Sequence, residues 1–105
     1  MNISIQEKID PNKGPIIYVQ GEIDVYTAPQ LRERLLPLCE KGTTVTLDLA
    51  GVEYIDSTGL GVLIGAYKAQ RATAGKLVLV GMNGRLLRLF KITGLHEIIE
   101  IEETT

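Results

Sequence analysis

The alternation of apolar and polar residues along the chain predicts a series of strands separated by helices. Ile3 and Ile5 alternate with polar residues and predict a short edge strand, and Ile16–Gln20 predicts a second strand after the turn-forming residues 10–14. These two strands are close enough in sequence to pair as an antiparallel hairpin. A third strand is predicted over 44–49, with its apolar pattern resuming at 52–55, and the last over 98–101. The continuous apolar run Leu77–Val80 is typical of a parallel strand buried on both faces.

Apolar residues at helical spacing predict three helices between these strands. The first begins after Thr27, which forms a possible capping box with Gln30, and Pro37 is expected to kink or shorten it. The second, Leu60–Thr73, is surrounded by apolar residues in its first two turns, so we expect the sheet to cover one side and consider a partner protein for the other. The third is predicted to follow Asn83 as its cap.

The resulting order β-β-α-β-α-β-α-β predicts a single α/β domain over residues 1–105. Its sheet is expected to be mostly parallel with one antiparallel edge strand and right-handed crossovers. The carboxyl ends of parallel strands lie along one edge of such a sheet, where ligands usually bind. The segments Gly21–Thr27, Asp56–Gly59 and Gly81–Asn83 are therefore predicted to share one surface.

Composition and charge narrow the class of protein. The 105 residues are 45% hydrophobic and 23% charged, as expected for a soluble globular protein, and the formal net charge of −2 gives no basic footprint for nucleic acid. No apolar run approaches the ~20 residues needed to cross a bilayer, and the first residues do not resemble a secretory signal. The single cysteine excludes an intrachain disulfide and fits a reducing cytosol. We therefore expect a cytoplasmic protein that binds neither membrane nor nucleic acid directly.

The polar junction Asp56-Ser57-Thr58, between an apolar strand and an apolar helix, is the main candidate for a functional site. These residue types cap helix N-termini, where free N–H groups and the helix dipole favour an oxygen acceptor or an anion. A serine at this place is also well positioned for phosphorylation. On residue types alone, simple capping is the favoured interpretation.

Catalytic interpretations of this junction lack their motifs. The nucleophile elbow G-x-S-x-G fails because Ile55 stands two residues before Ser57, and the only histidine, His96, is interpreted as a loop residue. Gly59, Gly61 and Gly65 resemble a dinucleotide fingerprint, but the third glycine is one position too late. We interpret these glycines as small residues that let the helix pack close to the sheet or to a partner's backbone.

The remaining polar groups receive structural interpretations. No set of His and Cys has metal-ligand spacing, and Cys39 is assigned to the core. Arg85, Arg88 and Lys91 are interpreted as the solvated face of the third helix. We predict no catalytic residue, no metal site and no cofactor.

Three segments together resemble the anti-sigma factor antagonists of the STAS domain family. They read G-E-I-D-V-Y-T-A-P at 21–29, Y-I-D-S-T-G-L-G at 54–61 and R-L-F-K-I-T-G-L at 88–95, and the resemblance covers nearly the whole chain. The first segment is most similar to the general-stress, sigma-B type antagonists of Gram-positive bacteria, with the sporulation antagonists as close relatives. The resemblance therefore implies a STAS-like fold.

The resemblance also implies partner switching in a stress response. The unmodified protein would bind an anti-sigma factor that is also a serine kinase, and so free the sigma factor to support transcription. Phosphorylation, which falls on Ser57, would abolish binding until a metal-dependent serine phosphatase removes the phosphate. We expect the partner contact to involve Asp56, Thr58, Gly59, Leu60 and Gly61, bordered by Asp24 and Thr27. The alternatives are a nucleotide-binding or weakly nucleotide-hydrolysing module and a constitutive scaffold of a stress-sensing complex.

Overall fold

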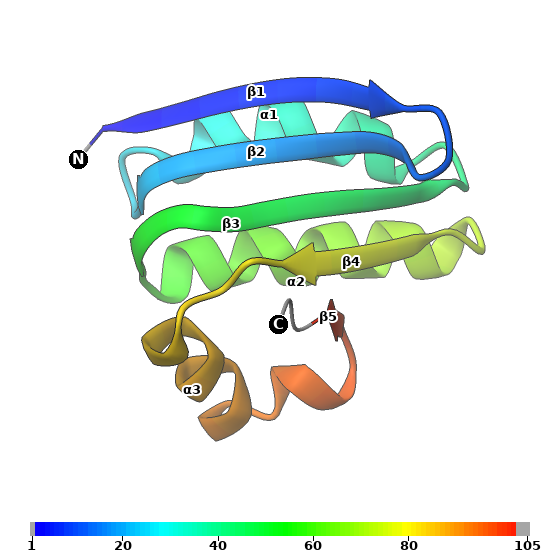
Figure 1. Ribbon diagram of the computed structural model, residues 1–105. Helices are drawn as coiled ribbons and strands as arrows, with labels where there is room; N and C mark the ends of the chain where they lie inside the picture. The colour runs from blue at the N-terminus through cyan, green and yellow to red at the C-terminus, as the bar shows by residue number, and fades with distance from the viewer. Residues whose placement is uncertain (1, 103–105) are drawn as a thin grey trace.

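The computed structural model describes residues 2–102, which form a five-stranded sheet with three α-helices (Figure 1). In chain order the elements are β1 (Ile3–Asp10), β2 (Gly14–Ile23), α1 (Ala28–Cys39), β3 (Thr44–Ile55), α2 (Ser57–Ala72), β4 (Lys76–Val80), α3 (Gly84–Ile92), the 3-10 turn η1 (Leu95–Glu97) and β5 (Glu100–Glu102). The spatial order of the strands is β1-β2-β3-β4-β5. Only β1 and β2 pair antiparallel, and the other neighbours are parallel. The predicted fold class is therefore confirmed.

The two longer helices lie side by side on one face of the sheet, behind it in Figure 1. Leu31 and Leu35 of α1 and Val62 and Leu63 of α2 are buried in the common core. This contact supplies the second cover that the apolar start of α2 requires. A partner protein is therefore not needed to cover Val62 and Leu63, because an amphipathic helix of the same chain does so.

The hairpin and the helix ends differ from the predicted boundaries. β1 and β2 are longer than predicted, and α2 begins at Ser57 instead of Leu60. Helix α1 continues through Pro37 to the buried Cys39, so the proline does not end it. A proline in the last turn removes a single backbone hydrogen bond, which the packing of the apolar face can offset.

Strand β3 is one continuous strand in which the alternation of side chains changes halfway. Its pairing with β2 shifts register twice, between Tyr18 and Gln20 and between Gly21 and Glu22 on the β2 side. At each shift β3 carries one extra residue, which is a β-bulge. After Leu49 the buried positions consequently become Val52 and Ile55, three residues apart. The apparent gap in the apolar pattern at 50–51 comes from these bulges.

The third helix takes a position that a longer β4 would have occupied. β4 pairs only with Thr44–Asp48, the first five residues of β3. The chain then runs past the remaining part of β3 into α3, which lies apart from the layer formed by the other two helices (Figure 1). Asn83 caps α3 as predicted, because its Oδ1 accepts a hydrogen bond from Leu86 N at 2.8 Å. Leu86 and Phe90 anchor the helix in the core.

Candidate functional site

The junction between β3 and α2 presents a serine whose hydroxyl has no structural task. Asp56 has an extended backbone, and its Oδ1 accepts a hydrogen bond from Gly59 N at 3.0 Å, so Asp56 is the helix cap. Ser57 is the first residue of α2, and both Ser57 and Thr58 are exposed. Within residues 2–102 no hydrogen bond involves the Ser57 hydroxyl. Capping therefore does not compete with a modification of Ser57.

The loop between β2 and α1 is held by a compact hydrogen-bond network around Asp24 and Thr27. The Asp24 carboxylate accepts hydrogen bonds from Tyr26 N at 2.9 Å and Thr27 N at 3.0 Å. The Thr27 hydroxyl donates to Glu22 O at 2.7 Å and accepts from Asp24 N at 2.9 Å. Partial burial disfavours the charged carboxylate, but the hydrogen bonds from Thr27 and Tyr26 outweigh it, so the pKa of Asp24 lies below its ordinary value.

The predicted capping box at the start of α1 is wrong. Thr27 occupies the N-cap position but makes no side-chain cap hydrogen bond, because its hydroxyl is engaged by Glu22 and Asp24. Thr27 is 1% exposed. Its side chain therefore shapes the loop from inside and does not present itself to a partner.

The two polar loops lie against each other at one edge of the sheet. Asp56 N donates a hydrogen bond to Ile23 O at 3.1 Å, which ties the start of α2 to the end of β2. Gly59 makes this approach possible: a Cβ at this position would lie 2.6 Å from Ile23 Cγ2 and 2.6 Å from Ile55 Cγ1. The predicted common surface of Gly21–Thr27 and Asp56–Gly59 is confirmed.

The third predicted segment, Gly81–Asn83, does not lie at the end of β3 with the other two segments. Because β4 is short, the segment lies beside the middle of β3, where Asn83 Nδ2 donates to Val52 O at 3.4 Å and Gly81 approaches Ala50. The part of the chain that flanks the end of β3 is α3 itself. The sequence analysis placed this segment on one surface with the other two, and the short β4 moves it toward the middle of β3.

The remaining glycines of α2 face away from the chain. A Cβ added at Gly61 or Gly65 would meet no heavy atom within 4 Å. Of these three glycines, Gly59 alone packs closely onto the sheet, and close packing of Gly61 and Gly65 against a partner's backbone stays a prediction. Gly61 lies one turn after Ser57 on the same face of the helix and is exposed, whereas Leu60 is half-buried against the core.

Exposed apolar side chains lie in the same two segments as Asp24 and Ser57, and sequence reasoning did not single them out. Tyr26 is 69%, Val25 57% and Tyr54 50% exposed. Val25 and Tyr26 stand between Asp24 and Thr27 in a turn, where no core is within reach, and this placement is the signal that could have identified them. We call the surface formed by residues 24–26 and 54–58 the Ser57 rim. It combines a free hydroxyl with apolar contact area, as protein interfaces do.

Two other reactive side chains are not part of this surface. His96 Nδ1 lies 3.3 Å from Phe90 O, so the imidazole faces the backbone at the end of α3 and not a serine. Cys39 is buried, and desolvation raises the pKa of its thiol to about 11. Both observations agree with the structural roles predicted for these residues.

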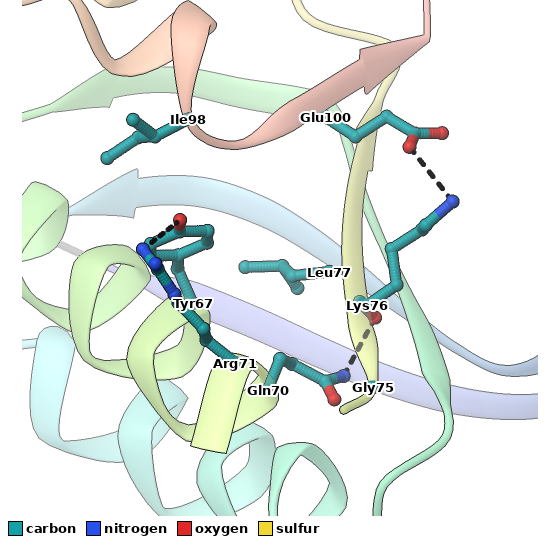
Figure 2. A pocket seen from close by; sticks show the side chains of 8 residues that line it. All are labelled: Tyr67, Gln70, Arg71, Gly75, Lys76, Leu77, Ile98 and Glu100. Carbon is teal, nitrogen blue, oxygen red and sulfur yellow. Dashed lines mark hydrogen bonds and ion pairs between the residues drawn. The ribbon is translucent and has the colours of Figure 1, made fainter. Parts of the chain in front are cut away.

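A separate cavity of about 310 Å³ lies at the opposite end of α2, between that helix, the start of β4 and the segment leading into β5 (Figure 2). Its charged side chains have partners: Lys76 Nζ lies 3.2 Å from Glu100 Oε1, and Arg71 Nη1 donates to Tyr67 Oη at 3.4 Å. The buried Gln70 donates from Nε2 to Lys76 O at 2.8 Å, whereas its Oε1 accepts no hydrogen bond from the described residues. The cavity has neither a glycine-rich loop nor a helix N-terminus in its lining. It therefore lacks the usual features of a phosphate site.

Two other features are absent from residues 2–102, a candidate metal site and a helix that could cross a membrane. In that range no group of three or more His, Cys, Asp or Glu side chains is arranged to hold a metal ion. None of its helices combines the length and the hydropathy that crossing a membrane would require.

Comparison with known proteins identifies the family. The STAS domain family model matches residues 2–105. The chain belongs to the STAS domain family. It is 50% identical over 103 residues to the anti-sigma-B factor antagonist of Listeria monocytogenes, covering 97% of this chain and 90% of that one. It is 48% identical over 101 residues to the anti-sigma-B factor antagonist of Bacillus subtilis, covering 96% and 92%.

The fold of this STAS domain also matches a solved structure. The crystal structure of an anti-sigma factor antagonist from Mycobacterium paratuberculosis superimposes with a TM-score of 0.84 at 26% sequence identity, covering 98% of this chain and 87% of that one. The match includes nearly the whole sheet and its helices. The resemblance seen in the three sequence segments is therefore supported by both sequence and fold.

Proposed function

We propose that this STAS domain is an anti-sigma factor antagonist that works by partner switching. Its unmodified form binds an anti-sigma factor that is also a serine kinase, and the sigma factor is released. Phosphorylation of Ser57 abolishes this binding, and a metal-dependent serine phosphatase restores it. The observation that carries the proposal is the exposed Ser57 hydroxyl, left free because Asp56 caps the helix. The sigma-B antagonists to which the chain is 48% and 50% identical support the same role.

The fold tolerates a phosphate on Ser57. A phosphoserine adds about −1.5 to −2 charges at neutral pH. Here the phosphate stands at the N-terminus of a 16-residue helix, where the dipole and the free N–H groups of the first turn favour an anion. Phosphorylation therefore changes what the protein can bind and leaves its structure intact.

The loss of binding arises at the interface. A docked kinase would remove water from the phosphate and bring it together with the half-buried carboxylate of Asp56 and the apolar side chains of Tyr26 and Tyr54. Burying a charge without a cationic partner is strongly unfavourable. A hundredfold loss of affinity needs only ~2.7 kcal/mol, because each factor of ten corresponds to about 1.4 kcal/mol.

The residues around Ser57 divide into contacts and supports. Thr58 and Gly61 are exposed and lie where the kinase would dock over Ser57. Asp24, Thr27 and Gly59 act indirectly, because their hydrogen bonds or small size hold the two loops together. In this role the protein is a cytoplasmic binding module without a catalytic group or cofactor of its own, and it contacts neither nucleic acid nor membrane.

The nucleotide-binding alternative has less support. The space beside the Gly59 Cα is occupied by the side chains of Ile23 and Ile55, and Gly61 lies on an open helix surface. These glycines therefore do not form a phosphate-binding loop. Equilibrium dialysis with ATP and GTP tests this point. A pure protein-binding module shows no saturable nucleotide site. The scaffold alternative is tested by co-purification, since a scaffold would be recovered as a large homo-oligomer and not with a kinase.

The proposal is tested by phosphorylation of the purified protein. Incubation with the cognate kinase and ATP should modify Ser57 alone, as mapped by mass spectrometry. Ser57→Ala should bind the kinase without being modified, and Ser57→Asp should keep the fold in circular dichroism but bind more weakly in calorimetry. Ser4→Ala makes the same change at an exposed serine of β1, outside this surface, and should be bound and phosphorylated like wild type. Phosphate on Thr58 alone, or none at all, would contradict the assignment.

A further inference from the structure

A mostly apolar groove of about 310 Å³ lies between the end of β3 and α3, directly beside the Ser57 rim. One wall is formed by Glu53–Ile55, the last three residues of β3. The other wall is one face of α3, with Leu89 and Ile92 among its lining residues. We call this feature the α3 groove. Its wall on β3 ends one residue before Asp56, so it continues the surface that carries Ser57.

The groove follows from the different lengths of β3 and β4. Beyond Asp48 the edge of β3 has no strand beside it, and the segment after β4 passes there before it enters α3 (Figure 1). A helix cannot pair with a strand edge as a strand does. Asn83 Nδ2 reaches the β3 backbone there, where it donates to Val52 O at 3.4 Å. The result is a gap lined by side chains.

Two features of the groove are typical of a surface that binds another protein. The first is apolar: Ile92 is 75% and Tyr54 50% exposed, although each is large enough to be a core residue. The second is electrostatic: Arg85 and Arg88 line the same groove, and neither has a carboxylate partner within the described residues 2–102. Arg85, Arg88 and Ile92 are spaced three and four residues apart and so lie on one face of α3.

We propose that the α3 groove is the second half of the kinase-binding surface. It accepts an apolar side chain from a segment of the kinase whose carboxylates pair with Arg85 and Arg88. This inference rests on the proposed function and specifies the chemistry of its partner. A specific interface covers roughly 800 Å² on each protein, so a kinase centred on Ser57 extends over the adjoining groove.

The charges of the groove argue against a second copy of this chain as the occupant. A symmetric dimer uses the same patch on both subunits. Pairing through the α3 groove would bring Arg85 and Arg88 of both copies into one contact, where like charges repel. The groove also holds the carboxylate of Glu53, but two guanidinium groups leave it with a net positive charge. An acidic segment of a different protein matches that charge and avoids the repulsion.

The test compares variants of the groove with matched variants outside it. Ile92→Glu places a carboxylate on the apolar wall, and Ile98→Glu makes the same change at another exposed isoleucine, which lines the cavity at the far end of α2. Arg88→Glu reverses a charge of the groove. Lys91→Glu reverses a charge on the same helix at an exposed residue outside its lining.

Each unphosphorylated variant is titrated by calorimetry with the kinase that phosphorylates this chain, after circular dichroism has shown the native fold. We expect Ile92→Glu and Arg88→Glu to weaken binding at least about tenfold, equivalent to ~1.4 kcal/mol. Ile98→Glu and Lys91→Glu should stay within about threefold of wild type, as expected for residues outside an interface. If Ile92→Glu does not fold, Ile92→Ala replaces it, with an expected loss of about fivefold.

The outcomes separate this inference from the proposed function. If the groove variants bind the kinase like wild type while Ser57→Asp does not, the kinase does not occupy the groove, and the proposed function stands. If the groove variants slow dephosphorylation by the phosphatase, or abolish self-association, without changing kinase affinity, another occupant is identified and the inference is overturned. If Ser57→Asp also binds like wild type, the proposed function itself fails.

Discussion

Substitution of Gly61 is expected to change stability and kinase binding in opposite directions. It lies inside α2, one turn after Ser57, and a Cβ added there would meet nothing within 4 Å. A glycine in a helix interior costs roughly 0.8–1.0 kcal/mol relative to alanine, because it loses more backbone freedom on folding. Packing within the described residues does not require a glycine at this position.

Gly61→Ala should therefore raise the free energy of unfolding by about 1 kcal/mol. For a domain of this size that corresponds to an increase in Tm of about 5 °C. The added methyl group points outward over the face that carries Ser57, so it should stand between the helix and a docked kinase. We expect the affinity for the kinase to fall about tenfold, or ~1.4 kcal/mol, although the protein is more stable.

Urea unfolding followed by circular dichroism measures the first effect, and calorimetric titration with the kinase measures the second. Gly59→Ala is the contrasting variant, since its Cβ would lie 2.6 Å from side-chain atoms of Ile23 and Ile55. It should lower stability by about 1–3 kcal/mol. A destabilised Gly61→Ala protein would refute the open environment assigned to this residue. A stabilised Gly61→Ala protein with wild-type affinity would refute a close approach of the kinase over Gly61.

Two further predictions concern the loop that supports the Ser57 rim. Thr27→Val removes a buried hydroxyl that bonds Glu22 O and Asp24 N, so it should cost about 1–3 kcal/mol in urea unfolding, whereas Thr27→Ser should retain most of the stability. Because the pKa of Asp24 is lowered in the folded state, its carboxylate stabilises the fold fully above the unfolded value of 3.8, and this contribution is lost as the pH falls through the folded value. Asp24→Asn should accordingly lose less stability than wild type between pH 5 and pH 2, and equal losses would show that the carboxylate is not stabilised by the loop.

The sequence predicted those features that depend on local chemistry. The element order, the antiparallel hairpin and the caps at Asp56 and Asn83 follow from apolar periodicity and from short polar side chains before helices. The exposed serine at the start of α2 was predictable for the same reason. Each of these features is decided by residues within a few positions of one another.

Features that depend on distant parts of the chain were not predictable. Thr27 is a residue type that commonly caps helices, but its hydroxyl is hydrogen-bonded to Glu22 O and Asp24 N instead of to the first turn of α1. Nothing in the local sequence of β4 indicates that it ends alongside Asp48, and this length places α3 beside β3. The α3 groove is a consequence of that arrangement.

Residues on α3 illustrate the same limit for function. A helical pattern separates a buried face from a solvent face, and Arg85 and Arg88 fall on the latter. Only the structure shows that they share a groove with Tyr54 and Ile92 next to the serine. The proposed binding surface is thus assembled from segments that lie far apart in the sequence.

The central claim is that a phosphate on Ser57 switches kinase binding off without unfolding the domain. The most direct measurement titrates the kinase with the wild-type chain in two forms, unphosphorylated and phosphorylated on Ser57 alone, with circular dichroism recorded for both. The account predicts identical spectra and an affinity at least about a hundredfold lower for the phosphorylated form, a difference of ~2.7 kcal/mol. Equal affinities for the two forms would contradict it.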